Sequence, residues 1–200
     1  EGLVVLNRND GSAEWLDQSS KDIKRNIFSF WSNHEILKNV RRNINGVEFS
    51  LDGNDYTVPI LGEYNIQNVL QVIHLAQRYL DEEKIIESLK DFKTPIGRME
   101  VISYEPYKVI IDYAYTPTML NGALGYLSQV KPEGSNIITV FGCAGERDKN
   151  RRQMGGVAAK YSSIVLLTSE DPKSEKVADI NSEIFSYAEN EGGVLVERIG

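Results

Sequence analysis

Three short segments of the sequence combine residue types that can bind a small polar ligand. The first, residues 112–118, reads Asp-Tyr-Ala-Tyr-Thr-Pro-Thr and follows an apolar run. A carboxylate in that position, Asp112, can accept hydrogen bonds from both hydroxyls of a ribose or help to hold a metal ion. Thr116 or Thr118 can cap the helix that follows, with Pro117 in its first turn. The spacing alone supports equally well a structural interpretation, in which Asp112 closes the strand and Thr-Pro starts the helix.

The second segment, residues 142–152, reads Gly-Cys-Ala-Gly-Glu-Arg-Asp-Lys-Asn-Arg-Arg. Its two glycines allow the backbone to approach an anion, and a helix that follows presents free N–H groups. Four cationic side chains stand against two acidic ones, a local surplus of +2 in a chain whose net charge is −7. We therefore predict a phosphate or carboxylate ligand. The segment does not match the G-x-G-x-x-G dinucleotide pattern, and a solvated, charged turn is the competing interpretation.

The third segment, residues 169–175, reads Ser-Glu-Asp-Pro-Lys-Ser-Glu. Mixed charges around a proline are typical of a rigid polar loop that contacts an amino acid, and equally of an ordinary surface turn. Elsewhere, Asn65 and Asn68 lie three residues apart at the start of an expected helix, where amides can cap the helix or contact a base edge. Arg98 directly follows a Pro/Gly hinge, which makes it a candidate site residue. The competing interpretation is an ordinary surface cation.

The elements expected after the hinge at 94–97 alternate between strand and helix. Apolar runs such as IITVF and IVLL, joined by helical segments, predict a mainly parallel α/β sheet. Ligands bind such sheets at the carboxyl ends of the strands, where all three segments would lie. The expected strands are 99–104, 108–113, 136–141, 163–168 and 193–199, and the expected helices are 118–130, 152–161 and 176–190.

Before the hinge, short alternating runs precede two helices. Asn45-Gly46 and Asp52-Gly53 lie between these runs and predict hairpin turns. Helical spacing of apolar residues then predicts one helix over 65–80 and a second that Asp81 caps. The other expected elements are strands over 3–7, 26–31, 43–51 and 56–61 and a helix over 13–24.

Composition limits the class of protein. The chain has 200 residues, of which 41% are hydrophobic and 26% charged, as in ordinary globular proteins. The net charge of −7 argues against a general nucleic-acid or anionic-membrane surface. No apolar run approaches the ~20 residues of a membrane-spanning helix, and no signal peptide opens the chain, so we expect a cytoplasmic protein. Cys143 is the single cysteine, which excludes a disulfide or a four-thiolate zinc site within the chain.

These motifs together resemble the second half of a Mur ligase, and the nearest branch is the UDP-N-acetylmuramoyl-tripeptide synthetases. The resemblance extends from about residue 3 to residue 199. It implies a Rossmann-like, mainly parallel sheet with helices on both faces over residues 93–200, preceded over 1–92 by the α+β end of a P-loop central domain. The motifs are GEYNIQN at 62–68, GRME at 97–100, DYAYTP at 112–117, FGCAGERDK at 141–149 and TSEDPKSE at 168–175.

The resemblance implies an ATP-dependent, amide-forming ligase of peptidoglycan synthesis, with Mg²⁺ and ATP required by the whole enzyme. Such an enzyme adds an amino acid, for example L-lysine or meso-diaminopimelate, to UDP-N-acetylmuramoyl-L-alanyl-D-glutamate through an acyl phosphate. By position, Asn68 matches the amide that contacts adenine, Arg98 an arginine that contacts ATP, and Asp112 the carboxylate on the ribose. Arg147 matches the residue that binds the carboxylate of the incoming amino acid, and 170–173 match the specificity loop.

The sequence departs from the family pattern at two places, position 115 and the segment 170–173. The histidine of the family's DYAHTP motif, which we place with the ATP-contacting residues, is Tyr115 here. The specificity loop, Asp-Asn-Pro-Arg in enzymes that add meso-diaminopimelate, is Glu170-Asp171-Pro172-Lys173. Lys173 can pair with a distal carboxylate, without the bidentate fork of arginine, or the two acids can hold a cationic side chain. The sequence leaves the acceptor open.

The sequence contains no G-x-x-x-x-G-K-[ST] phosphate-binding loop. The family's carbamylated lysine for Mg²⁺ and its Gly-Lys-Gly-His-Glu-like segment are also missing, and no metal ligands are expected here. Glu1 is followed at once by a strand, so we expect a piece of a longer protein, although removal of a tag also explains a missing methionine. We therefore expect the N-terminal and P-loop segments of the same polypeptide as partners, and no ligation by this chain alone.

Four alternatives remain. The first is a free-standing nucleotide- or amino-acid-binding module derived from such a ligase. The second is a ligase that lengthens another peptide, as cyanophycin and folylpolyglutamate synthetases do, against which FGCAG-x-RDK argues. The third is a Rossmann dehydrogenase, which the missing glycine pattern disfavours. The fourth is a Cys143 nucleophile, for which His34 and His74 show no triad order. We expect His74, Trp15 and Trp31 to have structural roles.

Overall fold

The computed structural model describes residues 2–8, 10–19, 25–30, 37–104, 106–189 and 195–198. The expectations for His34 and Trp31 lie outside these ranges. The chain divides into two compact units, residues 1–95 and 96–200. Among the described residues, none of the helices has both the length and the apolar character that crossing a membrane requires.

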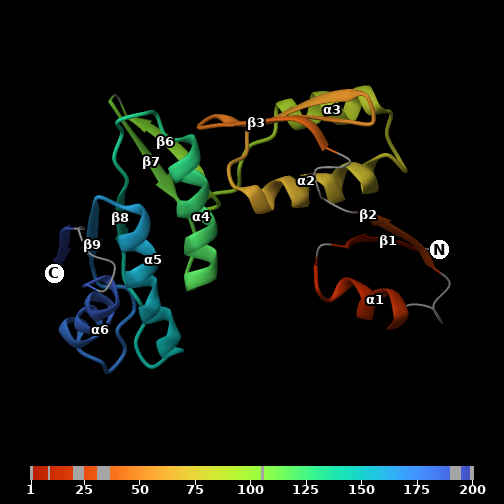
Figure 1. The fold of residues 1–200 in the computed structure, drawn as a ribbon. Coiled ribbons are helices and arrows are strands. Elements are labelled where there is room, and N and C mark those ends of the chain that lie inside the picture. Colours follow the sequence, from red (N-terminus) through yellow and green to blue (C-terminus); the bar gives the residue numbers. More distant parts are fainter. Residues whose placement is uncertain are drawn as a thin grey trace. The chain divides into compact units, whose positions relative to one another are not determined.

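The first unit begins with two parallel strands, β1 (Gly2–Asn7) and β2 (Arg25–Phe30), joined through helix α1 (Ala13–Ser19) (Figure 1). The turn before α1 is held by Asp10, whose side chain accepts a hydrogen bond of 2.7 Å from the backbone N–H of Ser12. The part of the expected helix after residue 19 lies outside the described ranges.

A three-stranded antiparallel sheet follows, formed by β3 (Leu37–Asn43), β4 (Gly46–Leu51) and β5 (Asn54–Val58). Asn45-Gly46 and Asp52-Gly53 lie at its two turns, which confirms both hairpins. The expected strand over 43–51 was wrong at its start, because residues 43 and 46 pair with each other across the first turn. Strand β3 was not expected, because five of the seven residues in its sequence LKNVRRN are charged or polar. Such a composition is tolerated at the edge of a sheet, where β3 lies.

Helices α2 (Glu63–Ala76) and α3 (Glu82–Lys90) complete the first unit. The apolar stripe of α2 is buried, with Leu70 and Ile73 fully enclosed, and it shares one core with β4, β5 and α3. The helix ends at residue 76, four residues earlier than expected. Asp81 occupies the N-cap position of α3 with extended backbone, but its side chain makes no capping hydrogen bond, contrary to the expectation.

The second unit contains an antiparallel hairpin and a separate parallel sheet. The hairpin pairs β6 (Glu100–Tyr104) with β7 (Tyr107–Ile111). The expectation that these two strands join the parallel sheet was wrong for the described residues. Only two residues separate β6 from β7, and parallel strands need a crossover of about a dozen residues or more.

The parallel sheet has the strand order β10-β9-β8 and confirms the mixed α/β class. Its strands are β8 (Ile138–Phe141), β9 (Ile164–Leu167) and β10 (Leu195–Arg198). The helices are α4 (Pro117–Val130), the short 3₁₀ helix η1 (Lys149–Gln153), α5 (Met154–Tyr161) and α6 (Val177–Glu189) (Figure 1).

Local chemistry explains where these helices begin and how they pack. The Thr116 hydroxyl accepts a hydrogen bond of 3.3 Å from the Met119 N–H, with Pro117 in the first turn, so Thr116 is the cap. Helix α5 approaches α6 closely at Gly155, where an added Cβ would lie 2.0 Å from the carbonyl oxygen of Ile184. The core of this unit lies between β9 and helices α4, α5 and α6.

Candidate functional site at the carboxyl ends of three strands

A cavity of about 440 Å³ opens where β7, β8 and β9 end. Its volume lies within the ordinary range for small-molecule sites. All three segments that the sequence singled out in this unit contribute to it. Its lining residues are Asp112, Tyr113, Ala114 and Tyr115 after β7; Val140, Phe141, Gly142, Cys143, Arg147 and Arg151 in and after β8; and Ser169 and Glu170 after β9.

Asp112 joins the two ends of the hairpin at the rim of this cavity. Its Oδ2 accepts a hydrogen bond of 2.9 Å from the backbone N–H of Met99, a buried residue in the left-handed backbone region with φ 52°. Among the described residues the other oxygen of Asp112 has no hydrogen-bond partner. The carboxylate therefore has a structural role and still has one oxygen available for a ligand.

Two arginines and two tyrosines form a continuous stack beside the cavity. The guanidinium of Arg98 lies 5.0 Å from the ring centre of Tyr113, and that of Arg151 lies 4.7 Å from the ring centre of Tyr115. The two rings meet edge to face, with centroids 5.5 Å apart. These are favourable cation–π and aromatic geometries, so Tyr115 provides a platform for Arg151. Sequence analysis did not single out Arg151 as a site residue; its place in the same loop as Arg147 was the available signal.

The four cations of the second loop have two different roles. Arg152 is only 1% exposed; its Nη1 donates to the carbonyl of Ala144 at 3.1 Å, and its guanidinium lies 3.3 Å from Glu175 and 3.5 Å from Glu183. Lys149 also pairs with Glu183, at 3.6 Å. Arg147 and Arg151 line the cavity and pair with no carboxylate among the described residues. Of the four cations that the sequence offered for an anion, two are therefore available, the guanidinium groups of Arg147 and Arg151.

The glycines of this loop are explained by packing between loops. A Cβ at Gly145 would lie 1.9 Å from the carbonyl oxygen of Pro172, and one at Gly142 would lie 2.5 Å from that of Thr168. The Gly145 N–H donates to the carbonyl of Asp171 at 2.9 Å. The two glycines thus allow the second and third loops to touch, a requirement that needs no bound anion.

The third loop is braced from both sides. Glu175 accepts hydrogen bonds from the backbone N–H of Glu146 and from Arg152, and Ser174 donates to the Glu146 carboxylate. The N–H of Glu146, assisted by the Arg152 charge, lowers the pKa of Glu175.

Within the expected specificity segment, only Glu170 lines the cavity. Lys173 forms an ion pair of 2.6 Å with Oδ2 of Asp171, and its hydrogen bond lowers the pKa of that carboxyl. Asp171, Pro172 and Lys173 are absent from the cavity wall. The loop therefore presents a carboxylate, and not the Lys173 ammonium, to the cavity.

The two asparagines of the first unit also differ in role. Asn65 is buried, and its amide donates to the carbonyl of Leu61 at 2.6 Å, which holds the chain before α2. Asn68 is exposed, and its amide donates to Oδ1 of Asn65 at 3.1 Å. Asn65 is therefore a structural residue, and Asn68 is the amide that remains accessible.

The structure contradicts a Cys143 nucleophile. The thiol is 2% exposed, it donates to the carbonyl of Arg151 at 3.5 Å, and burial raises its pKa, which disfavours the reactive thiolate. His74 lies in the other unit, on α2, with Nδ1 3.3 Å from Oε1 of Gln77, and burial lowers its pKa. The expected structural role of His74 agrees with this position.

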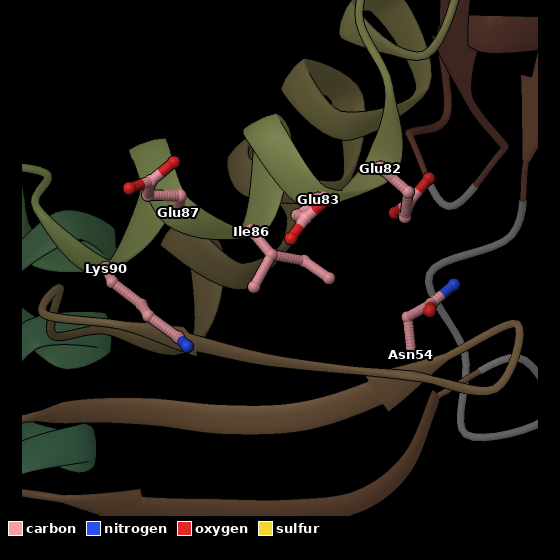
Figure 2. A pocket seen from close by; sticks show the side chains of 6 residues that line it. All are labelled: Asn54, Glu82, Glu83, Ile86, Glu87 and Lys90. Carbon is pink, nitrogen blue, oxygen red and sulfur yellow. The ribbon is translucent and has the colours of Figure 1, made fainter.

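A second cavity, of about 570 Å³, lies in the first unit beside α3. Figure 2 shows glutamates 82, 83 and 87 with Ile86 and Lys90 along that helix, and Asn54 across from them on β5. The described residues contain no group of three or more His, Cys, Asp or Glu side chains placed to hold a metal ion. This hollow contains none of the predicted site residues.

The family described as "Mur ligase, glutamate ligase domain" matches residues 97–198. The chain belongs to the Mur ligases. This match begins two residues after the end of the first compact unit and includes all three loops of the candidate site.

Two curated relatives show how much of a Mur ligase the chain spans. It is 42% identical over 154 residues to the UDP-N-acetylmuramoyl-L-alanyl-D-glutamate–2,6-diaminopimelate ligase of Clostridium perfringens, covering 72% of this chain and 31% of that protein. It is 32% identical over 199 residues to the protein of the same name from Chlamydia pneumoniae, covering 94% of this chain and 41% of that protein. The chain therefore spans less than half the length of these relatives.

Solved structures share the fold. The UDP-N-acetylmuramate–alanine ligase of Thermotoga maritima aligns with a TM-score of 0.73 at 19% identity, over 98% of this chain and 43% of the other. A structure named as a 2,6-diaminopimelate ligase aligns with a TM-score of 0.63 at 24% identity, over 99% of this chain and 42% of the other. These likenesses confirm the Rossmann-like α/β fold class.

Proposed function

We propose that this chain is the amino-acid-binding part of an ATP-dependent ligase that extends the peptide of UDP-N-acetylmuramoyl-L-alanyl-D-glutamate. The observation that supports this is the meeting of Asp112, Arg147 and Glu170 at one cavity within the region that matches the family. Two relatives are named for the addition of diaminopimelate to this nucleotide, which makes that amino acid the first acceptor to test.

We also propose how the chain divides into domains and where the ligase works in the cell. Residues 1–92 would be the end of the central, ATP-binding domain, and residues 93–200 most of the C-terminal domain. The sequence also predicts that the ligase works in the cytoplasm, on soluble substrates and without nucleic acid or membrane. Both statements stay predictions.

We propose that the residues that contact the nucleotide are Asn68, Arg98, Asp112 and Tyr115. Asp112 fits a ribose because one carboxylate oxygen remains available while the other is fixed by the Met99 N–H at 2.9 Å. Arg98 is positioned by its stack on Tyr113, 5.0 Å from the ring centre, which favours a charged contact with phosphate. Bound ATP supplies the phosphoryl group that activates the carboxylate of the growing peptide.

For the incoming amino acid, we propose that Arg147 and Glu170 make the direct contacts at the cavity. Asp171, Pro172 and Lys173 belong to the same proposed specificity segment and would shape the loop that carries Glu170. A guanidinium without a carboxylate partner is suited to an amino-acid carboxylate, which it can bind through two parallel hydrogen bonds. Glu170 offers the opposite charge at the same cavity. Together they would orient the acceptor so that its free amine faces the activated carboxyl. We assign the Mg²⁺ requirement to the whole enzyme, as the resemblance to the family implies.

The test is ligation by the full-length protein that contains this chain, supplied with UDP-N-acetylmuramoyl dipeptide, ATP, Mg²⁺ and each amino acid in turn. Arg147→Ala should raise the KM for the amino acid at least tenfold more than the KM for ATP, because it removes a charged hydrogen bond to the acceptor alone. Equal effects on both would remove Arg147 from the acceptor site. Asp112→Ala should weaken ADP binding.

The mass of the protein in its native cells separates this proposal from a free-standing binding module. A mass roughly twice 22.5 kDa or more agrees with a complete ligase. A mass near 22.5 kDa, with ADP binding and no turnover, would favour the module instead.

A further inference from the structure

Four charged side chains line the cavity: Asp112, Arg147, Arg151 and Glu170. Asp112 already accepts the Met99 N–H, whereas the other three form no ion pair among the described residues. An acceptor in this cavity thus meets two guanidinium groups and one carboxylate that need partners.

This set fits an amino acid with two charged ends better than one with a simple cationic side chain. Diaminopimelate has two carboxylates and two amines, whereas lysine has one carboxylate and two amines. If Arg147 binds the α-carboxylate, lysine leaves Arg151 unpaired beside its ammonium group. Diaminopimelate supplies a second carboxylate for Arg151 and a distal ammonium for Glu170.

Lys173, the cation that the sequence offered for a distal carboxylate, is engaged elsewhere. Its ammonium lies 2.6 Å from Asp171, and neither side chain lines the cavity. The loop is also fixed from behind, because the Gly145 N–H donates to the Asp171 carbonyl at 2.9 Å. Lys173 could serve the cavity only by breaking this ion pair.

Arg151, by contrast, is held at the cavity. Its guanidinium rests on the ring of Tyr115 at 4.7 Å, and its backbone N–H donates to the Asp148 carbonyl at 3.1 Å within η1. Tyr115 is itself steadied by Tyr113, 5.5 Å away between ring centres. A stacked guanidinium keeps its N–H edge free for a carboxylate.

We propose that Arg151, held on the ring of Tyr115, binds the distal carboxylate of diaminopimelate and so selects this acceptor over lysine. Glu170 binds the distal ammonium. This proposal links Tyr115 and Lys173, two positions at which the sequence differs from the family pattern. Arg151, held by Tyr115, makes the contact with the distal carboxylate that Lys173 does not make. This inference rests on the proposed ligase function.

The experiment compares kcat/KM for meso-diaminopimelate and L-lysine in the full-length protein, for wild type and Arg151→Met. We expect the variant to lose about 10- to 100-fold with diaminopimelate, the effect of one charged hydrogen bond, and about threefold or less with lysine. Lys149→Met is the matched control: it removes a cation of the same loop that pairs with Glu183 at 3.6 Å and does not line the cavity. It should leave the ratio between the two acceptors unchanged.

Three outcomes would overturn the inference. A raised KM for ATP, with equal losses for both acceptors, would place Arg151 on a phosphate. Loss of the diaminopimelate preference in Lys173→Met, but not in Arg151→Met, would return the contact to the third loop. A wild-type preference for lysine would exclude the charge match. Absence of ligation with either amino acid in the wild type would contradict the proposed function itself, which keeps the two failures distinct.

A second pair of variants tests the role of the ring and does not depend on the folding of Arg151→Met. Tyr115→Phe keeps the stack and should keep the diaminopimelate preference. Tyr115→Leu removes it and should reduce that preference about three- to tenfold, the worth of a partly desolvated cation–π contact. Equal preferences in the two variants would show that the ring does not hold Arg151.

Discussion

The cavity beside α3 and the cavity at the ends of β7, β8 and β9 differ in how they are built. The hollow of the first unit is the larger, about 570 Å³, yet one helix supplies five of its six lining residues. The cavity of the second unit, about 440 Å³, is lined by the loops that follow three different strands. Three separate loops can place groups of opposite charge around a ligand, whereas one helix face presents them in a row. The convergence of segments distinguishes the candidate site better than its volume.

The two cavities also differ in how their charges are compensated. Glu83 and Glu87, which Figure 2 labels on α3, are exposed, so water solvates their charges. In the second unit Arg152 is buried, and its guanidinium contacts two carboxylates and one carbonyl that belong to three chain segments. We infer that Arg152 fixes the loops, and that its neighbours Arg147 and Arg151 are thereby left for a ligand.

The largest expected effect in this comparison comes from Arg152→Met. The variant leaves Glu175 and Glu183 without their buried partner and the Ala144 carbonyl without its donor. Because both carboxylates keep some contact with solvent, we expect a loss of about 2–4 kcal/mol in the free energy of unfolding of the second unit. Urea unfolding followed by pulsed alkylation of Cys143 measures it, since this buried thiol is the only cysteine and lies in that unit.

The first unit provides the internal reference. Both tryptophans of the sequence, at positions 15 and 31, belong to it, so tryptophan fluorescence reports on that unit. Arg152→Met should leave the fluorescence midpoint unchanged. Arg147→Met, an exposed arginine of the same loop, should change the Cys143 midpoint by about 0.5 kcal/mol or less. If both arginine variants had the same effect, Arg152 would have no special part in fixing the loops.

A smaller but still large effect is expected for Gly145→Ala. The new methyl group would lie 1.9 Å from the Pro172 carbonyl, so the second and third loops would have to separate and break the Gly145–Asp171 hydrogen bond. We expect a loss of about 1–3 kcal/mol in the second unit and weaker amino-acid binding. Gly11→Ala in the first unit is the control, because nothing lies within 4 Å of its added Cβ. A neutral Gly145→Ala would contradict the packing explanation for this glycine.

The sequence predicted the three loops well because strand periodicity and turn chemistry are local signals. The apolar runs predicted strand ends at residues 113, 141 and 168, and the observed ends are residues 111, 141 and 167. The rule for α/β sheets then predicted that the loops after these ends lie together. The Asn-Gly and Asp-Gly turns were equally local. The pairing of β6 with β7 followed from their short connection, a signal that was available and that the expectation of one continuous sheet overlooked.

The sequence could not separate Arg151 from Arg152. The two residues are adjacent and of one type, and only the fold buries one against Glu175 and stacks the other on Tyr115. The same limit applies to Lys173. Its ammonium pairs with Asp171, two residues earlier, and its backbone is left-handed with φ 54°, and neither feature could be predicted from the sequence. Charge counts predict that an anion can bind, but they do not predict which cations remain available.

Acidification should weaken the second unit through the carboxylate of Glu175. The pKa of Glu175 is lowered in the folded chain, so its contribution to stability is complete above the ordinary glutamate pKa of about 4.3 and is lost as the pH falls through the lowered value. In wild type we expect the urea midpoint of the second unit to decrease as the pH falls below about 4.5. At these pH values the exposure of Cys143 is followed with a dithiodipyridine, a disulfide reagent that still reacts with thiols in acid, in place of alkylation. In Glu175→Gln the second unit should be less stable than in wild type at neutral pH. Its stability should also lack the decrease in acid that Glu175 causes. An unchanged pH profile in Glu175→Gln would assign the effect to other carboxyls.

The smallest effect is expected from Glu83→Gln and Glu87→Gln in the hollow of the first unit. On α3 these two residues lie four apart, so each substitution relieves a repulsion of a few tenths of a kcal/mol. Glu83 also lies in the first turn, where a negative charge is favourable, and Glu87 lies three residues before Lys90, so each loses an attraction of similar size. The fluorescence midpoint should therefore move by no more than about 0.5 kcal/mol, with no change in ADP or amino-acid binding. A loss of ligand binding in either variant would make the acidic hollow a second site and would contradict the conclusion that converging loops distinguish the functional cavity.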